Sequence, residues 1–211
     1  MKLLLATTNQ GKIKQLKSIC ERSSIEAVAP QDLNLGSIPE VEETADNYLD
    51  NAKLKAVAFS KWSGLPALAD DSGIEVFALA GRPGIHSARM GETDDERIEN
   101  LLEEMRKNRV IIPHHRYARY ICWTSIAIPA PDQPDGFIFL EGDGQLLGNI
   151  QPVRKGTKGF GYDSIFYANP LKSTVAEADQ ELVAKINHRA QAVEMVINKF
   201  KDHLNGVAPS A

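Results

Sequence analysis

Residues 68–73 read Leu-Ala-Asp-Asp-Ser-Gly, an apolar run that ends in two consecutive carboxylates. Adjacent side chains of an extended strand point to opposite faces, so Asp70 and Asp71 serve one site only if the strand stops there and the chain bends. The pair Ser72-Gly73 permits such a bend. Carboxylates held close together need a shared proton, a basic partner or a divalent cation with oxygen ligands. The stretch therefore predicts either a chemical site or a polar turn that caps a strand, and its own residues leave both interpretations open.

The composition is typical of a folded, soluble protein with one sizeable core or a two-lobed domain. The 211 residues carry a net charge of −4, which argues against a binder of nucleic-acid backbones but leaves a nucleotide pocket possible. Cys20 and Cys122 lack the paired spacing of a zinc or redox motif, so reduced, intracellular thiols are expected. The apolar start, residues 1–6, is shorter than the roughly seven residues of a signal peptide, and no run approaches the roughly eighteen of a membrane span. No nucleic-acid or membrane partner is therefore expected.

The N-terminal segment predicts a strand, a polar loop and a helix. Leu3–Ala6 is apolar, residues 7–12 read Thr-Thr-Asn-Gln-Gly-Lys, and apolar residues then recur at helical spacing. Backbone N–H groups at a helix start favour an anion, and Lys12 adds a full charge. The loop lacks the first glycine and the Ser or Thr of a Walker loop. Two interpretations stay open: the loop binds phosphate, or Thr8 or Asn9 only caps the helix.

The rest of the chain predicts further strands and helices around a sheet. Residues 74–79 fit a strand or a short helix, and the glycine- and proline-rich residues 81–89 fit a shaped surface loop. The predicted strands are 25–29, 119–128, 137–141 and 145–150, the later ones in antiparallel pairs. Three further helices are predicted. One has an apolar side of Leu49, Ala52, Ala56 and Phe59, and the next begins at a capping box of Thr93 and Glu96. The last has an apolar side of Leu182, Ile186, Ala190, Val193, Ile197 and Phe200.

Three further groups of residues are candidates for chemistry. Glu42 and Glu43 precede a predicted helix, where they either favour its positive end or supply a metal ligand to the aspartates. Glycines flank an aromatic residue in 155–163, which either presents the ring to a base or simply forms a flexible turn. The last predicted helix has three potential donors near its beginning, for which a solvated basic face is the alternative: Lys185, His188 and Arg189.

Taken together and in this order, the motifs resemble the Ham1/inosine triphosphatase family. The resemblance rests on residues 7–12, 42–44, 69–73, 83–89, 160–163 and 188–189 and runs from Met1 to about His203. It implies an elongated, two-lobed α/β fold with a central mixed β-sheet flanked by helices and an active site in the cleft between the lobes. It also implies Mg²⁺-dependent hydrolysis of inosine, deoxyinosine and xanthosine triphosphates (ITP, dITP and XTP) to the monophosphate and pyrophosphate by a cytoplasmic homodimer. We expect one such domain over residues 1–204 and a loose tail over 205–211.

The resemblance also implies a role for each residue that matches a motif. The implied metal ligands are Glu43, Asp70 and Asp71, and Asp71 is also the base that activates water. The phosphates are contacted by Thr7, Thr8, Asn9, Gln10, Gly11, Lys12 and Ser72. The base is stacked by Phe160, its pocket is shaped by Gly161, Tyr162 and Asp163, and its 6-keto edge is contacted by His188 and Arg189.

The sequence departs from the family pattern at four positions. Val183 stands where family members commonly carry a substrate-binding Lys, and we hypothesise that Lys185 partly replaces it. The other departures, which bear on substrate preference, are Ser164, His86 and Asn187. Two rival functions remain: a pyrophosphatase for modified pyrimidines or ordinary triphosphates, and a nucleotide-binding regulatory module without turnover.

Overall fold

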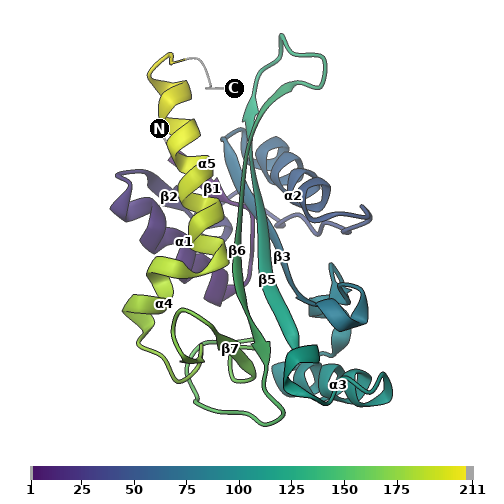
Figure 1. Ribbon diagram of the computed structural model, residues 1–211. Coiled ribbons are helices and arrows are strands. Elements are labelled where there is room, and N and C mark those ends of the chain that lie inside the picture. Colours follow the sequence, from purple (N-terminus) through teal and green to yellow (C-terminus); the bar gives the residue numbers. More distant parts are fainter. Residues whose placement is uncertain (1, 208–211) are drawn as a thin grey trace. The chain divides into compact units, whose positions relative to one another are not determined.

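A computed structural model describes residues 2–207 (Figure 1). These residues divide into two compact units. The described residues of unit 1 are 2–71, 122–144 and 189–207, and unit 2 comprises Ser72–Ile121 and Gln145–His188. Most of the predicted tail, residues 208–211, lies outside the described residues. That residues 1–204 act as one domain stays a prediction.

The described residues form one mixed sheet, as predicted. Its strand order is β2-β1-β3-β5-β6-β7-β8, with β4 paired to β3. Strand β1 is parallel to β2 and β3, whereas β4 is antiparallel to β3, and β7 is antiparallel to β6 and β8. The bounds are β1 (Lys2–Leu5), β2 (Glu26–Val28), β3 (Ala67–Val76), β4 (Pro83–Gly84), β5 (Tyr117–Pro129), β6 (Phe137–Ile150), β7 (Phe166–Ala168) and β8 (Ser173–Thr174).

Helices flank the sheet, and side-chain caps define where several of them begin. Asn9 and Asn47 cap the first two α-helices, and Thr93 with Glu96 forms the predicted capping box. The α-helices are α1 (Gln10–Arg22), α2 (Tyr48–Ser63), α3 (Asp94–Lys107), α4 (Gln180–Ile186) and α5 (His188–Leu204), and the 3₁₀ turns are η1 (Pro30–Asp32), η2 (Phe77–Leu79), η3 (Ser87–Met90) and η4 (Pro113–His115). None of the helices in the described part of the chain is long and apolar enough to cross a membrane.

In unit 1, alternate residues of the strands pack into two different clusters. Leu3 and Leu5 of β1 and Leu68 of β3 pack with apolar residues of α1 and α5. Ala67 and Ala69 of β3 pack instead with the α2 residues, which include Ala56 and Phe59. The strand alternation therefore gives one face of the sheet to α1 and α5 and the opposite face to α2.

Unit 2 has a single apolar core. It is built from the last part of β3, the apolar side of α3, the unit 2 parts of β5 and β6, strand β7 and two residues of α4. Phe166 of β7 is fully buried in it, and the α4 residues are Val183, which is buried, and Ile186, which is partly buried.

Three predictions about the elements were wrong. The strands predicted at 137–141 and 145–150 are one continuous strand, β6. Strand β3 runs through Ser72-Gly73 without the predicted bend, so the two aspartates stay on opposite faces of one strand. The predicted last helix is two helices, because Asn187 has the extended conformation (φ −69°, ψ 151°) between α4 and α5. Leu182, assigned to the apolar side, is 53% exposed. Residues 74–79, left open between strand and helix, contain both: β3 ends at Val76 and η2 follows.

Candidate active site

Asp70 lies on the face of β3 that α1 and α5 cover. Its Oδ2 atom is 2.9 Å from Lys12 Nζ and accepts a hydrogen bond from Arg189 Nε at 3.0 Å, and its side chain is 1% exposed. The second donor of Arg189, Nη1, bonds to Gln15 Oε1 at 2.7 Å. Burial by itself raises the pKa of Asp70, but the charges of Lys12, Arg189 and Lys55 outweigh burial and hold that pKa well below its usual range. Asp70 is therefore an ionised carboxylate with two cationic neighbours.

Asp71 lies on the opposite face of β3, toward α2. Its Oδ1 atom is 3.2 Å from Lys55 Nζ, and its Oδ2 atom accepts a hydrogen bond of 3.3 Å from Asn51 Nδ2. The same Lys55 ammonium lies 2.7 Å from Glu43 Oε1. Burial raises the pKa of Asp71, Lys55 opposes that rise, and the negative charge of Glu43 reinforces it, so the pKa is raised overall. A carboxylate with a raised pKa is a better proton acceptor than an exposed one.

Lys55 joins the two acidic motifs, and sequence reasoning missed it. Burial lowers its pKa, but the carboxylates of Asp71, Asp70 and Glu43 more than offset burial, so the pKa is raised and the ammonium stays charged. Asn51 and Lys55 are four residues apart on α2 and so share one face of that helix. This spacing was the available signal, since two polar residues on the buried side of a helix need partners.

The donor set at Glu43 and Asp71 suits a divalent cation. Their carboxylates already share one positive group, the Lys55 ammonium. Within residues 2–207, no group of three or more His, Cys, Asp or Glu side chains is arranged as a ready metal site. Mg²⁺ does not need such a group, because it binds one or two carboxylates and takes its other ligands from phosphates and water. The residues present therefore fit a metal that arrives with a phosphorylated substrate.

The loop at the start of α1 is an ordered helix cap. Asn9 Oδ1 accepts the backbone N–H of Lys12 at 3.0 Å, and the N–H of Asn9 donates to Thr7 Oγ1 at 3.2 Å. The capping interpretation is thus confirmed for Asn9. Thr8, Asn9 and Gln10 are exposed, whereas Gly11 and Lys12 are half-buried. Capping and anion binding are compatible, because the cap orders the helix end whose dipole favours an anion.

In unit 2, the loop around Phe160 is held by side chains of the same unit. Asp163 Oδ2 accepts the N–H of Phe160 at 3.0 Å, and Asp94 Oδ2 accepts the N–H of Gly161 at 2.7 Å. Tyr162 donates its hydroxyl to the backbone oxygen of Ser87 at 2.7 Å. Phe160 itself remains 37% exposed. The loop therefore presents an aromatic ring from an anchored backbone, which favours stacking over simple flexibility.

Glycine is required at position 159 of this loop. Its φ of +78° is in the left-handed region, and a Cβ atom there would collide with the carboxylate of Asp163. The Asp163 carboxylate can reach the backbone of Phe160 only because Gly159 leaves that space open.

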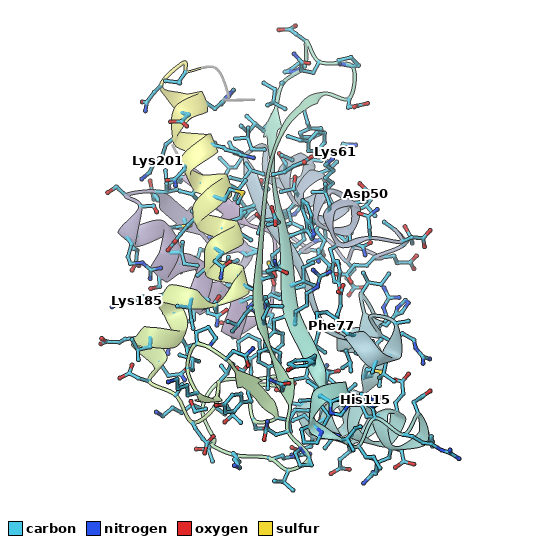
Figure 2. The ribbon with its side chains drawn as sticks, in the orientation of Figure 1. Asp50, Lys61, Phe77, His115, Lys185 and Lys201 are labelled. Atoms are coloured by element: carbon cyan, nitrogen blue, oxygen red, sulfur yellow. The ribbon has the colours of Figure 1, made fainter. Side chains whose placement is uncertain are left out.

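The donors of the C-terminal motif have different partners. His188 is buried in unit 2, where its ring stacks on Tyr120, whereas Arg189 binds Asp70 in unit 1. Lys185 is exposed on α4 (Figure 2). Its predicted replacement of the family Lys, and the predicted contacts of His188 and Arg189 with a base, stay predictions. Ser72 follows the two aspartates on β3 and is half-buried.

Asp94→Ala is expected to loosen the Phe160 loop. The variant removes a charge-assisted acceptor from the N–H of Gly161, and such bonds contribute about 1.5–3 kcal/mol. The Gly161 amide should therefore exchange with solvent at least about tenfold faster, as measured by hydrogen exchange followed by NMR. Asp95→Ala is the matched control, because it removes the same charge from the first turn of α3. Equal exchange of Gly161 in both variants would contradict the anchoring role of Asp94.

Comparison with known proteins extends over nearly the whole chain. The Ham1 family matches residues 3–199. A dITP/XTP pyrophosphatase of Nostoc sp. is 38% identical over 207 residues, which cover 98% of this chain and 97% of that protein. A dITP/XTP pyrophosphatase of Thermus thermophilus is 38% identical over 209 residues, covering 96% and 93%. The solved structure of a HAM1 protein from Coxiella burnetii has a TM-score of 0.81 and 31% identity, covering 96% of this chain and 99% of that chain.

Proposed function

The chain belongs to the Ham1 family, as its motifs predicted, and on this premise we propose that it is a nucleoside triphosphate pyrophosphatase. Its proposed substrates are the deaminated purine nucleotides ITP, dITP and XTP, each hydrolysed to the nucleoside monophosphate and pyrophosphate. The observation that carries the proposal is the pair of aspartates on β3, each with its own cationic partner: Lys12 and Arg189 for Asp70, and Lys55 for Asp71. A protein that only binds nucleotides has no need of a buried carboxylate with a raised pKa.

Asp71 is proposed as the general base. A water molecule attacks the α-phosphorus and transfers its proton to the Asp71 carboxylate, while the bond from that phosphorus to the bridging oxygen of the β-phosphate breaks. The electron pair of the broken bond leaves with pyrophosphate. Lys55 holds the Asp71 carboxylate in place at 3.2 Å. Its charge also opposes the rise in the Asp71 pKa that burial and Glu43 cause, which favours the ionised carboxylate.

The triphosphate is proposed to bind at the start of α1. The residues for it are Thr7, Thr8, Asn9, Gln10, Gly11, Lys12 and Ser72. Lys12 and Arg189 together carry one positive charge more than Asp70 balances, which favours an anion. Glu43 and Asp71 would hold Mg²⁺, with Asp70 as a further predicted ligand. When bound, the ion supplies neutralisation of phosphate charge and orientation of the attacked group.

The purine is proposed to bind to residues of the aromatic loop and the C-terminal motif. Phe160 supplies a ring for stacking, while Gly161, Tyr162 and Asp163 give the loop its shape. Donors from His188 and Arg189 suit the 6-keto oxygen of hypoxanthine or xanthine and oppose the 6-amino group of adenine. Lys185 is a further predicted contact. The protein is expected to act as a homodimer in the cytoplasm.

The decisive experiment is pyrophosphate release from ITP, XTP, GTP and ATP at equal concentration, with Mg²⁺ or with a chelator. We expect fast turnover of ITP and XTP, slow turnover of GTP and ATP, and loss of turnover in the chelator. The mechanism predicts this loss because the carboxylates of Glu43 and Asp71 outnumber the one Lys55 ammonium, so without a divalent cation they repel the phosphates.

Each other result selects a rival. Similar turnover of all four nucleotides would support the pyrophosphatase reaction and reject the preference for deaminated purines. Binding of ITP without release of pyrophosphate would identify a regulatory nucleotide-binding module.

A further inference from the structure

Tyr120 of β5 connects two motifs that are far apart in the sequence. It is 8% exposed, and its hydroxyl donates to Asp163 Oδ1 at 3.1 Å. The other oxygen of that carboxylate accepts the N–H of Phe160 at 3.0 Å. A two-step chain of hydrogen bonds therefore runs from the Tyr120 hydroxyl through Asp163 to the backbone of the exposed aromatic ring.

The ring of Tyr120 makes the second connection. It stacks almost parallel on the imidazole of His188, with centroids 4.7 Å apart and an angle of 12° between the planes. Phe166, fully buried in the unit 2 core, packs against Tyr120 with a centroid distance of 4.3 Å. The position of the Tyr120 ring is therefore set by the core, and the ring in turn sets the plane of the imidazole.

We propose that Tyr120 is a positioning residue for recognition of the base. Its hydroxyl fixes the loop that carries Phe160, and its ring fixes the imidazole of His188. One side chain therefore positions both the aromatic ring that stacks on the base and the imidazole that donates to it. The inference rests on the proposed function, in which Phe160 and His188 meet the purine. A core residue without this role would affect all substrates alike, whereas a positioning residue affects only substrates that carry a base.

Two variants separate the two connections. Tyr120→Phe keeps the ring and removes the hydrogen bond to Asp163, and Tyr120→Leu removes both. Tyr117→Phe is the matched control, because Tyr117 lies on the same strand and is 49% exposed. The substrates are ITP and ribose 5-triphosphate, which carries the phosphates and no base.

The quantity measured is the ratio of kcat/KM for ITP to kcat/KM for ribose 5-triphosphate. We expect the ratio to fall roughly fivefold in Tyr120→Phe, as for one lost hydrogen bond, and roughly 30-fold in Tyr120→Leu, where the ring contact is also lost. Most of the fall should come from a higher KM for ITP. Tyr117→Phe should leave the ratio unchanged. The Cε1 proton of His188 should also move downfield in the NMR spectrum of Tyr120→Leu, since it loses the shielding of the stacked ring.

The outcomes distinguish the inference from the proposed function. If the parent enzyme hydrolyses ITP and the ratio is unchanged in Tyr120→Phe and Tyr120→Leu, Tyr120 is an ordinary core residue and the inference is wrong. If Tyr120→Leu fails to fold, the ratio in Tyr120→Phe alone decides. If the parent enzyme does not hydrolyse ITP, the proposed function is wrong, and this inference, which rests on it, is wrong as well.

Discussion

Asp71→Asn is expected to reduce kcat for ITP hydrolysis by about a thousandfold while ITP still binds. The amide cannot accept the proton of the attacking water, and a positioned general base contributes roughly 10²- to 10⁴-fold to a rate. Asparagine keeps the size of the side chain and one oxygen toward Lys55, so the fold should persist. The measurement is single-turnover pyrophosphate release, with ITP binding followed by calorimetry.

The control for Asp71→Asn is Asp143→Asn, which removes the same charge from an exposed position on β6. It should leave kcat within about twofold, because exposed substitutions away from a site have small effects. Turnover by Asp71→Asn within tenfold of the parent would reject Asp71 as the base. In that event Glu43, the other carboxylate that Lys55 contacts, would become the candidate.

Asp70→Asn is expected to destabilise the protein by about 3–5 kcal/mol, because it leaves two cations without their buried counter-charge. Lys12 and Arg189 both bind the Oδ2 atom of Asp70, and the Arg189 side chain is 6% exposed. For a chain of this length, such a loss corresponds to a fall in Tm of about 6–20 °C. Unfolding in urea at pH 7, followed by circular dichroism, measures the free energy.

The control for Asp70→Asn is Asp32→Asn at an exposed ion pair. Asp32 binds Lys17 at 3.0 Å with 46% of its side chain exposed. Surface pairs of this kind contribute about 0–1 kcal/mol, so the variant should be almost as stable as the parent. Equal losses in the two variants would show that burial of Asp70 adds nothing to its ion pairs.

The stability difference between the parent and Asp70→Asn should also depend on pH. The pKa of Asp70 is lowered in the folded protein, relative to about 3.9 in an unfolded chain. Its contribution is therefore fully present above about pH 4 and is lost as pH falls toward the folded pKa. Urea unfolding at pH 7 and pH 3 should show the difference narrowing at pH 3. A constant difference would mean that the charge of Asp70 does not contribute.

Elements set by neighbouring residues could be read from the sequence. Asn9 was one of two predicted caps for α1, and the Thr93 and Glu96 capping box begins α3 as expected. The resemblance to the Ham1 family, which needed only the order of short motifs, was confirmed. Each cap depends on residues within a few positions of one another, and so does each short motif of the family, so the sequence contains the whole signal.

Partners brought together by packing could not be read from the sequence. Lys55 meets Asp71 across 16 positions, and Tyr120 meets Asp163 across 43. The bend predicted at Ser72-Gly73 was wrong because it assumed that both aspartates need one site. Helices cover both faces of the sheet, and they supply each carboxylate with its own cation.

The sequence by itself thus determined the family, most of the strands and helices, and the two carboxylates at the centre of the candidate site. Only the tertiary structure decided which cation neutralises which carboxylate and which side chains anchor the aromatic loop. The physical reason is that capping and hydrophobic periodicity act over one or two turns. Burial of a charge instead requires a partner from whichever element packs against it, at any distance along the chain.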